Sequence, residues 1–504
     1  MFPVTVLAYV GGMPSYSSVT SCTLVGVEPR PVRIETAVSH AKKDSFTIVG
    51  LPDTAVRESR ERVRAAMKQQ GFGFPSGRVV VNLSPADLPK NGVTFDLPIA
   101  LSVIAASSRD VMNFDAFVCV GELSLRGEVR PVSAGLGASL VAERQGKACM
   151  VASSSTIPTN DGAKIAGIAS LRHAFEVATG SVGPDTVAVP TTGDDRHVAD
   201  IASVRGNGPA RRALEVAAAG GHHLLMVGPP GAGKTMLAGC LPGILPPLNA
   251  DEIRQVSLIH AAAGSGRKVS DIAPFRSPHH SASIAALVGG GSGIPTPGEV
   301  SLAHHGALFL DELGEFNPSV LDALRQPIEQ GEIVVARQAA TVRFPSRVQV
   351  IAASNPCPCG FEGDNRTPCT CTDMRRDKYR ARLSGPLLDR FDMRLVITRL
   401  APDALMEPQG EASAPVQKRV LAARKRQHER GTLNRDLSRD QLDAFTVSDS
   451  AKVSLRALAR EPAMTARGWD RVRKVGRTLA DLEGTDMVDE QHIAEAASLR
   501  GEWR

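Results

Sequence analysis

A glycine-rich turn in the middle of the chain has the residue types and spacing of a phosphate-binding loop. The apolar run that starts at His223 ends in Gly-Pro-Pro-Gly-Ala-Gly-Lys-Thr, which fits the pattern G-x-x-x-x-G-K-T. Glycines let backbone N–H groups approach phosphate oxygens, which Cβ atoms would obstruct. Lys234 can then reach the β- and γ-phosphates, and Thr235 can offer its hydroxyl to Mg²⁺. The predicted nucleotide-binding residues are Gly228, Pro229, Pro230, Gly231, Ala232, Gly233, Lys234, Thr235 and Met236.

The alternative for this stretch is a chance glycine-rich turn between two core elements. The surroundings favour the phosphate site, because the motif requires a strand before the loop and a helix after it. An apolar run precedes the loop, and the helix-forming residues 236–238 follow it.

Two carboxylates close a second apolar run. Residues 307–310 read as a buried strand, and Asp311 and Glu312 follow it directly. Asp311 is predicted to hold Mg²⁺ through water, and Glu312 to orient or deprotonate the attacking water. An acidic pair after a strand is often only a solvated turn. Its position behind a P-loop favours the magnesium and water-activating roles.

A third strand is predicted over residues 348–354 and ends at Asn355, whose amide can contact the γ-phosphate or the attacking water. An Asn before Pro also simply starts a turn. Arg390 stands among apolar residues, where an ordinary salt bridge to Asp389 or Asp392 is the alternative to a functional role. Arg467 opens an amphipathic helix, and its alternative is a solvated helix start.

Four of the eight cysteines lie within fifteen residues, in the pattern C-x-C, nine residues, C-x-C. Four thiolates suffice for a tetrahedral zinc site. C-x-C pairs are less usual than C-x-x-C, and four reduced loop cysteines are the alternative. The role expected of the zinc is structural, because it would fix the segment after Asn355 and present the basic residues 375–382. The predicted ligands are Cys357, Cys359, Cys369 and Cys371.

The composition describes a globular protein of 504 residues, 42% hydrophobic and 22% charged, which is enough for roughly three domains. A formal charge of +5 permits nucleic-acid binding without requiring it. No run of eighteen apolar residues occurs, so we expect no membrane span. Residues 1–10 lack a basic start and read as a buried strand rather than a signal. Together with the clustered cysteines, this predicts a cytoplasmic protein.

The predicted site residues must be positioned by the folded elements of the chain, which divides into three successive units. Residues 1–178 mix strand and helix signals, with strands at 45–49 and 79–83, a helix capped by Asp53, a helix at 97–106 and a hairpin over 117–132. This is an α+β domain. Residues 179–199 read as a linker because they are rich in Thr, Gly, Pro and Asp without periodicity.

Alternating strands and helices over residues 200–401 predict a parallel α/β module, which begins with a helix that carries Arg211, Arg212 and Glu215. From residue 402 to 504 the patterns are mainly helical.

Several stretches together carry a resemblance to a known family. The order of the P-loop, the acidic pair, Asn355, residues 387–392 and Arg467 resembles an AAA+ ATPase. Within that class the chain resembles the Mg-chelatase-like family of YifB and ComM. It departs from the family at Asn207, where Gln is usual, and in its spacing around residues 11–25. The motifs span nearly the whole chain and lie at residues 46–53, 95–100, 217–222, 278–281, 355–360 and 480–482.

The resemblance implies a Lon-protease-like domain at 1–178, an AAA+ module at 200–401 and a helical lid at 402–504, assembled as a homo-hexameric ring. ATP lies between subunits in such rings, so Arg390 is implied to act in trans as an arginine finger. Asn355 is implied to be sensor 1, and Arg467 sensor 2. ComM-type members are DNA helicases that promote branch migration in natural transformation. The implied partner is therefore branched or single-stranded DNA, and the implied cofactors are ATP and Mg²⁺.

Two other functions compete with a DNA motor. A Lon-like protease needs a serine activated by a lysine, but the corresponding stretch 91–97 offers only Thr94, and no base pairs with it by spacing. A motor subunit of a metal-inserting chelatase shares the AAA+ module, but it would not need the added N-terminal domain.

Basic residues and a glycine-rich insert are the features that favour DNA. The basic clusters at 374–382 and 418–426 suit phosphate backbones, although charge runs are usually solvated faces. The insert at 289–298 resembles the pore-facing inserts of this AAA+ clade, and its alternative is a surface loop without a role.

Overall fold

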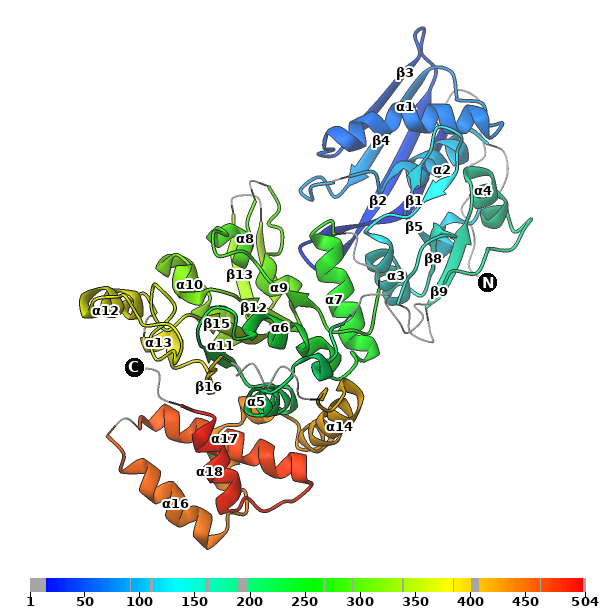
Figure 1. Cartoon of the computed structure of the whole chain (residues 1–504). Coiled ribbons are helices and arrows are strands. Elements are labelled where there is room, and N and C mark those ends of the chain that lie inside the picture. The colour runs from blue at the N-terminus through cyan, green and yellow to red at the C-terminus, as the bar shows by residue number, and fades with distance from the viewer. Residues whose placement is uncertain are drawn as a thin grey trace.

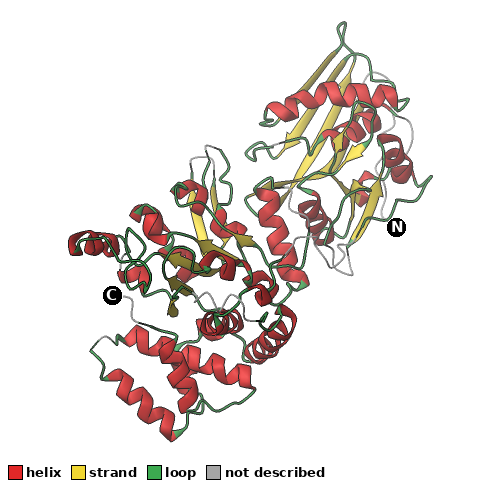
Figure 2. Ribbon diagram, viewed as in Figure 1, coloured by secondary structure: helices red, strands yellow, loops and turns green. Residues whose placement is uncertain are grey.

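The computed structural model describes residues 15–90, 92–108, 112–158, 163–188, 198–265, 269–291, 293–337, 340–383, 385–399, 408–462 and 464–501. These residues form an N-terminal α/β lobe, a central α/β lobe and a C-terminal helical lobe (Figures 1 and 2). The predicted mixed α/β architecture is therefore confirmed. The strand expected at residues 1–10 lies outside the described residues.

The N-terminal lobe is built on a seven-stranded sheet in the order β3-β4-β2-β1-β5-β8-β9. The central pairs β1–β2 and β2–β4 are antiparallel, and the outer pairs are parallel. Four helices cover the sheet. The strands are β1 (Ser15–Val25), β2 (Glu28–Ser39), β3 (Ser45–Val49), β4 (Arg78–Ser84), β5 (Phe117–Cys119), β8 (Ala148–Ala152) and β9 (Lys164–Ile168), and the helices are α1 (Thr54–Gln69), α2 (Asp96–Ser107), α3 (Gly135–Arg144) and α4 (Leu171–Thr179).

Local signals fixed several of these elements. The side chain of Asp53 accepts a hydrogen bond from Val56 N at 2.8 Å, which caps α1 as predicted. The hairpin expected over 117–132 is smaller than predicted. Only β6 (Glu122–Leu123) and β7 (Val129–Arg130) form it, because β5 joins the main sheet instead, where it pairs in parallel with β1 and β8.

The central lobe contains a five-stranded parallel sheet in the order β11-β12-β15-β10-β16. Helices cover both faces of such a sheet, so its strands are continuous apolar runs. All residues of β10, β12 and β15 are buried. The strands are β10 (Leu224–Val227), β11 (Phe275–Arg276), β12 (Ala307–Leu310), β15 (Gln349–Ser354) and β16 (Met393–Val396), with a separate hairpin of β13 (Glu332–Ala336) and β14 (Thr341–Pro345).

Nine helices described in the central lobe surround this sheet and hairpin, and most of them are short. Helix α5 ends just before β10, as predicted. They are α5 (Gly208–Gly220), α6 (Lys234–Gly239), α7 (Ala250–Ala262), α8 (Ile284–Val288), α9 (Glu299–Leu302), α10 (Pro318–Ala323), α11 (Arg325–Gln330), α12 (Asp373–Ala381) and α13 (Gly385–Leu388).

The C-terminal lobe, described over residues 408–462 and 464–501, is built of helices joined by short connecting segments. Its helices α14 and α17 pack against α5 of the central lobe and share its hydrophobic core, which includes Leu214, Val420 and Val472 (Figure 1). The helices are α14 (Ser413–Glu429), α15 (Arg439–Asp443), α16 (Asp449–Ala459), α17 (Ala466–Glu483) and α18 (Glu490–Ser498).

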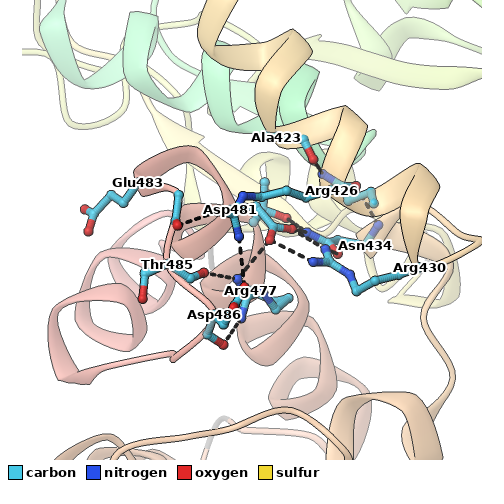
Figure 3. Close-up of polar contacts among 12 residues, drawn as sticks. Ala423, Arg426, Arg430, Asn434, Arg477, Asp481, Glu483, Thr485 and Asp486 are labelled. Atoms are coloured by element: carbon cyan, nitrogen blue, oxygen red, sulfur yellow. Dashed lines mark hydrogen bonds and ion pairs between the residues drawn. The ribbon is translucent and has the colours of Figure 1, made fainter.

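A buried polar cluster holds α14 and α17 together. Figure 3 shows Arg430 and Arg477 converging on Asp481, whose side chain is fully buried. Asn434 donates to the same carboxylate at 2.8 Å. Removal of one partner of a buried ion pair leaves an unpaired charge and costs about 3–5 kcal/mol. The cluster therefore fixes the geometry of the helical lobe as a unit.

Contacts between described residues join the N-terminal and central lobes at two or more places. Helix α3 packs beside α7, where Leu258 joins the N-terminal core. The turn between β1 and β2 reaches the β13–β14 hairpin, and Val25 and Val27 pack into the core that contains Val342. The first part of the predicted linker is also attached to the N-terminal lobe, because Asp185 pairs with Gly167 of β9. Linker residues 189–197 lie outside the described ranges.

A search of the described residues for a bilayer-spanning segment finds no helix with the length and apolar character required.

Candidate functional site

The P-loop connects the carboxyl end of β10 to α6 and is shaped for a charged ligand. Gly231 and Gly233 adopt φ of +77° and +83°, a backbone conformation that side chains with a Cβ rarely take. An added Cβ on Gly231 would meet nothing within 4 Å, so the loop lines open space there. The buried ammonium of Lys234 donates to Gly228 O at 2.5 Å and to Pro229 O at 3.0 Å. Burial lowers the pKa of Lys234, and the nearby carboxylates partly restore it.

The predicted magnesium ligands meet at the carboxyl edge of the sheet, where they follow β10 and β12 on either side of β15. Thr235 Oγ1 donates to Asp311 Oδ2 at 2.8 Å, and Asp311 Oδ1 accepts from Glu312 N at 2.9 Å. A hydroxyl beside a carboxylate is the oxygen donor set that Mg²⁺ takes when phosphates supply the remaining ligands. The residues present therefore fit a magnesium nucleotide.

Glu312 occupies an unusual backbone conformation and has an unpredicted partner. Its φ is +51°, which is uncommon for a residue other than glycine. Its carboxylate Oε2 lies 3.2 Å from His280 Nδ1, and the His280 ring is tilted against the ring of His279 with 4.1 Å between ring centroids. Residues 278–281 were part of the family resemblance, but the sequence did not predict that His280 contacts Glu312. The two residues are thirty-two positions apart.

Asn355 lies where the sequence predicted it, at the carboxyl end of β15. Its Oδ1 accepts from Lys234 Nζ at 3.3 Å, so it faces the phosphate-binding loop. Arg399, which no sequence signal singled out, donates its Nε to Pro230 O at 3.3 Å. The structure thus brings together Lys234, Thr235, Asp311, Glu312 and Asn355, and adds His280 and Arg399 to them.

Arg390 and Arg467 lie at the other edge of the sheet. Both line a cleft of about 1160 Å³ between the central lobe and the helical lobe, together with His223 and Val348. His223 precedes β10 and Val348 precedes β15, so the cleft lies at the amino ends of parallel strands whose carboxyl ends carry the P-loop. These two arginines are therefore separated from the P-loop of their own chain by the sheet.

The side chain of Arg390 bonds to residues of its own central lobe. Its Nη2 lies 2.7 Å from Glu329 Oε1, and its Nε donates to Arg325 O at 3.3 Å. Its acidic partner is Glu329 rather than the Asp389 or Asp392 considered as alternatives. Arg467 is exposed in the first turn of α17, after the cap at Thr465.

Asp392 couples the helical lobe to the sheet beside this cleft. Its carboxylate accepts from His223 N at 3.0 Å and pairs with Arg471 of α17. Burial alone raises the pKa of Asp392, but the His222 ring, whose Nδ1 lies 3.6 Å from the carboxylate, and the charge of Arg471 hold this pKa far below its ordinary value. Asp392 therefore links α17 directly to the residue that precedes β10.

The four clustered cysteines converge in space. Their Sγ atoms all lie within 4.8 Å of one another, and three of the pairs are separated by 3.4 to 3.7 Å. All four are free thiols. The convergence gives the donor set of a metal site. The residues are Cys357, Cys359, Cys369 and Cys371.

The predicted basic clusters are less available than their sequence indicated. Arg376 and Arg380 both bind Glu362, and Arg382 pairs with Glu315. Arg375 and Lys378 are exposed, and no ion pair involves them within the described ranges. Much of the cluster in 374–382 thus holds α12 in place.

The second basic cluster also serves packing. Arg419 pairs with Glu215 and Glu411, and Arg424 donates to Ala218 O at 2.7 Å. Lys418 and Lys425 remain exposed. Charge counted along the sequence therefore overstated the surface available for phosphates.

The glycine-rich insert lies against the β13–β14 hairpin. Gly290 pairs with Thr296, and Arg337 at the hairpin donates to Gly291 O at 3.3 Å. Figure 1 shows α8 and β13 projecting on the same side of the central lobe.

The protease alternative finds no catalytic geometry at Thr94. Thr94 is buried, and among the described residues its hydroxyl has no hydrogen bond to a base. The nearby Asp96 is committed to Arg62, 2.6 Å away, and to Ser59. Residues 94–96 are therefore part of the core of the N-terminal lobe, and within the described ranges Thr94 lacks the neighbouring base that a nucleophile would need.

Comparison with known proteins places these features in a family. Three family models match: subunit ChlI of Mg-chelatase at residues 34–155, magnesium chelatase subunit ChlI at 200–405, and the ChlI C-terminal model at 410–500. YifB of Salmonella typhimurium is 42% identical, covering 94% of this chain and 95% of its own length. The competence protein ComM of Haemophilus influenzae is 39% identical over 96% of this chain and 97% of its own. The magnesium-chelatase 38 kDa subunit of Cereibacter sphaeroides is 25% identical, over 40% of this chain and 55% of its own.

Proposed function

Because this chain belongs to the YifB and ComM family of Mg-chelatase-like AAA+ proteins, we propose that it is an ATP-driven motor that remodels DNA as a homo-hexameric ring in the cytoplasm. The observation that carries the proposal is the convergence of Lys234, Thr235, Asp311 and Glu312 at one edge of the central sheet. These are the groups that ATP hydrolysis requires.

Each residue has a separate task in this hydrolysis. Lys234 would clamp the β- and γ-phosphates, and Thr235 and Asp311 would hold Mg²⁺. The metal would supply the charge that neutralises the phosphate oxygens. Glu312 accepts a proton from the attacking water, and Asn355 orients that water or the γ-phosphate. His280 holds the Glu312 carboxylate at 3.2 Å, which limits the directions in which it can point.

A second copy of the chain completes the site. Arg390 and Arg467 lie on the amino edge of the sheet, away from the P-loop of the same chain. A head-to-tail ring brings that edge against the P-loop of the next subunit. Arg390 then acts as the arginine finger and Arg467 as sensor 2, both in trans. To do so Arg390 must leave Glu329, so subunit contact and hydrolysis are coupled.

Two projecting segments are proposed to face DNA in the ring: the insert at 289–298 and the β13–β14 hairpin, which contact each other through Arg337. The likeness to a competence protein supports DNA as the partner. Exposed cations away from internal ion pairs add phosphate contacts, at Arg375, Lys378, Lys418 and Lys425. Such contacts read the backbone and not the bases, so binding is sequence-tolerant.

The second candidate is a chelatase-like motor that remodels a protein partner during metal insertion. The three matching family models, all described by a magnesium-chelatase subunit, favour it. The N-terminal sheet lobe and the near full-length likeness to ComM favour the DNA motor.

We further propose that the four clustered cysteines hold a structural zinc ion.

ATPase measurements with and without DNA test the proposal. Branched or single-stranded DNA should raise the hydrolysis rate of a hexameric preparation, and the effect should weaken steeply as salt increases. The control is a Lys234→Ala protein, which should show no stimulated rate. Stimulation by a protein partner and none by DNA would favour the chelatase-like motor.

A further inference from the structure

The loop that carries the four cysteines is long and has no secondary structure of its own. It runs from residue 355, after β15, to residue 372, before α12. Loops beyond about 12–15 residues without internal structure are uncommon in a compact lobe, and they need some other constraint. The two C-x-C pairs lie near its beginning and its end, so a link between them would close the loop.

The sulfur positions fit a single tetrahedral metal centre. A metal 2.3 Å from four thiolates places the sulfurs about 3.8 Å apart. The sulfur of Cys357 lies 3.4 Å from that of Cys359 and 3.7 Å from that of Cys369, and Cys359 to Cys369 is 3.6 Å. A disulfide requires about 2.05 Å, so these sulfurs are not bonded to one another. An all-thiolate tetrahedral set favours zinc.

The part of the loop enclosed by the cysteines packs against Pro230 of the phosphate-binding loop. Gly360 packs so closely on Pro230 that an added Cβ would lie 2.6 Å from Pro230 Cδ. Arg399 bridges the two loops: it donates to Pro230 O at 3.3 Å and lies 3.5 Å from Asp364. Its guanidinium also lies over the ring of Phe361.

The same enclosed segment anchors the next helix. Glu362 binds Arg380 at 2.6 Å and Arg376 at 3.4 Å, both on α12. The α12 cap, Thr372, follows Cys371 directly. Closure of the cysteine loop therefore holds both Pro230 of the P-loop and the start of α12.

We infer that Cys357, Cys359, Cys369 and Cys371 bind one Zn²⁺, and that this centre braces the P-loop and thereby sets its affinity for ATP. The inference rests on the proposed function only in taking the P-loop to be the ATP site. Zn²⁺ replaces the four thiol protons, which are released to solvent, and leaves a centre of net charge −2. The arginines bound to Glu362 and Asp364 supply compensating positive charge beside it.

The first test is metal content and nucleotide affinity of the full chain purified without chelator. Elemental analysis should find about one zinc per chain, and the double variant Cys369→Ser/Cys371→Ser should contain none. The Kd for a fluorescent ATP analogue should rise about tenfold or more when the brace is lost, as expected for the loss of one or two hydrogen bonds. Cys240→Ala, a buried thiol of the same lobe outside the cluster, should keep both zinc and affinity.

Two further measurements keep the result independent of folding defects. Chelation of the unmodified protein should raise the Kd, and added zinc should restore it. Gly360→Ala should keep the zinc but weaken ATP binding, because its Cβ would displace Pro230.

Absence of zinc, or iron in its place, would overturn the metal assignment. Unchanged ATP affinity after complete zinc removal would overturn the brace. A zinc-loaded protein that binds no ATP would overturn both the brace and the proposed function, and would leave the zinc site standing.

Discussion

The imidazole Nδ1 of His280 lies 3.2 Å from Oε2 of Glu312, so the carboxylate proposed to activate water is held by a side chain from a different segment. His280 follows β11 and precedes α8, which leads into the glycine-rich insert. The proposed water-activating group is therefore connected to the segment proposed to touch DNA.

Replacement of His280 should slow hydrolysis without preventing ATP binding. A hydrogen bond to a charged group contributes about 1.5–3 kcal/mol, so kcat of His280→Ala should fall about 10- to 100-fold with little change in KM. His280→Gln, which keeps a donor, should recover part of the rate. His279→Ala is the matched control, and an equal loss there would show that the contact with Glu312 is not responsible.

Lys234 and Glu312 should fail in different ways. Lys234→Ala removes the charge that clamps the phosphates and should abolish both ATP binding and turnover. Glu312→Gln removes only proton acceptance and should leave a protein that binds ATP and retains it. Nucleotide binding measured beside turnover separates the two, and equal loss of binding in both variants would refute the division of tasks.

The arginine finger should be supplied by the neighbouring subunit. Arginine fingers contribute roughly 10³ to 10⁵ in rate, so Arg390→Ala alone should be nearly inactive. A mixture of Arg390→Ala and Lys234→Ala chains forms some interfaces with both groups intact, and it should regain activity. Mass measurement must first establish that mixed rings form; given mixed rings, no recovery at any ratio would contradict action in trans.

Acid should destabilise the fold through two buried histidines. Burial, with the charges of neighbouring residues, lowers the pKa of His223 and of His304 to about 3. The Nδ1 atoms of both accept backbone hydrogen bonds, from Val350 N at 2.9 Å and Arg347 N at 3.0 Å, which requires the neutral ring.

In the unfolded chain the two histidines are protonated near pH 6.5, whereas in the folded chain they are protonated only near pH 3. Their stabilising effect is therefore complete above pH 6.5 and is lost as the pH falls towards 3. Each should lower the free energy of unfolding by up to about 1.4 kcal/mol per pH unit in that window. Urea unfolding at several pH values measures the slope. His304→Asn should reduce the slope by up to about 1.4 kcal/mol per pH unit, which corresponds to one proton. An unchanged slope would show that His304 does not cause the pH dependence.

The chemistry that depends on adjacent residues was predictable from the sequence. The P-loop, the pair Asp311 and Glu312 and the cap Asp53 are local patterns, and the structure has the predicted strands and helix around them. The cysteine cluster was predictable as a set because its four members lie within fifteen residues.

Contacts between distant segments were not predictable in the same way. The partner of Arg390 is Glu329, sixty-one positions away, and no spacing rule connects them. The ion pairs of the basic cluster at 374–382 were not predictable for the same reason, since Glu362 and Glu315 neutralise much of it from other segments. Strand β5 was placed in a hairpin because its partner β8 lies beyond the range of local pattern.

We propose that a ring of this chain couples ATP hydrolysis to the movement of DNA branch points. The most direct measurement is resolution of a synthetic four-way junction by a demonstrably hexameric preparation, followed by gel or fluorescence. We predict resolution that requires ATP and Mg²⁺, does not depend on junction sequence and is absent in Glu312→Gln protein. A hexamer that hydrolyses ATP yet leaves the junction intact under all salt conditions, with a rate unaffected by DNA, would contradict the claim.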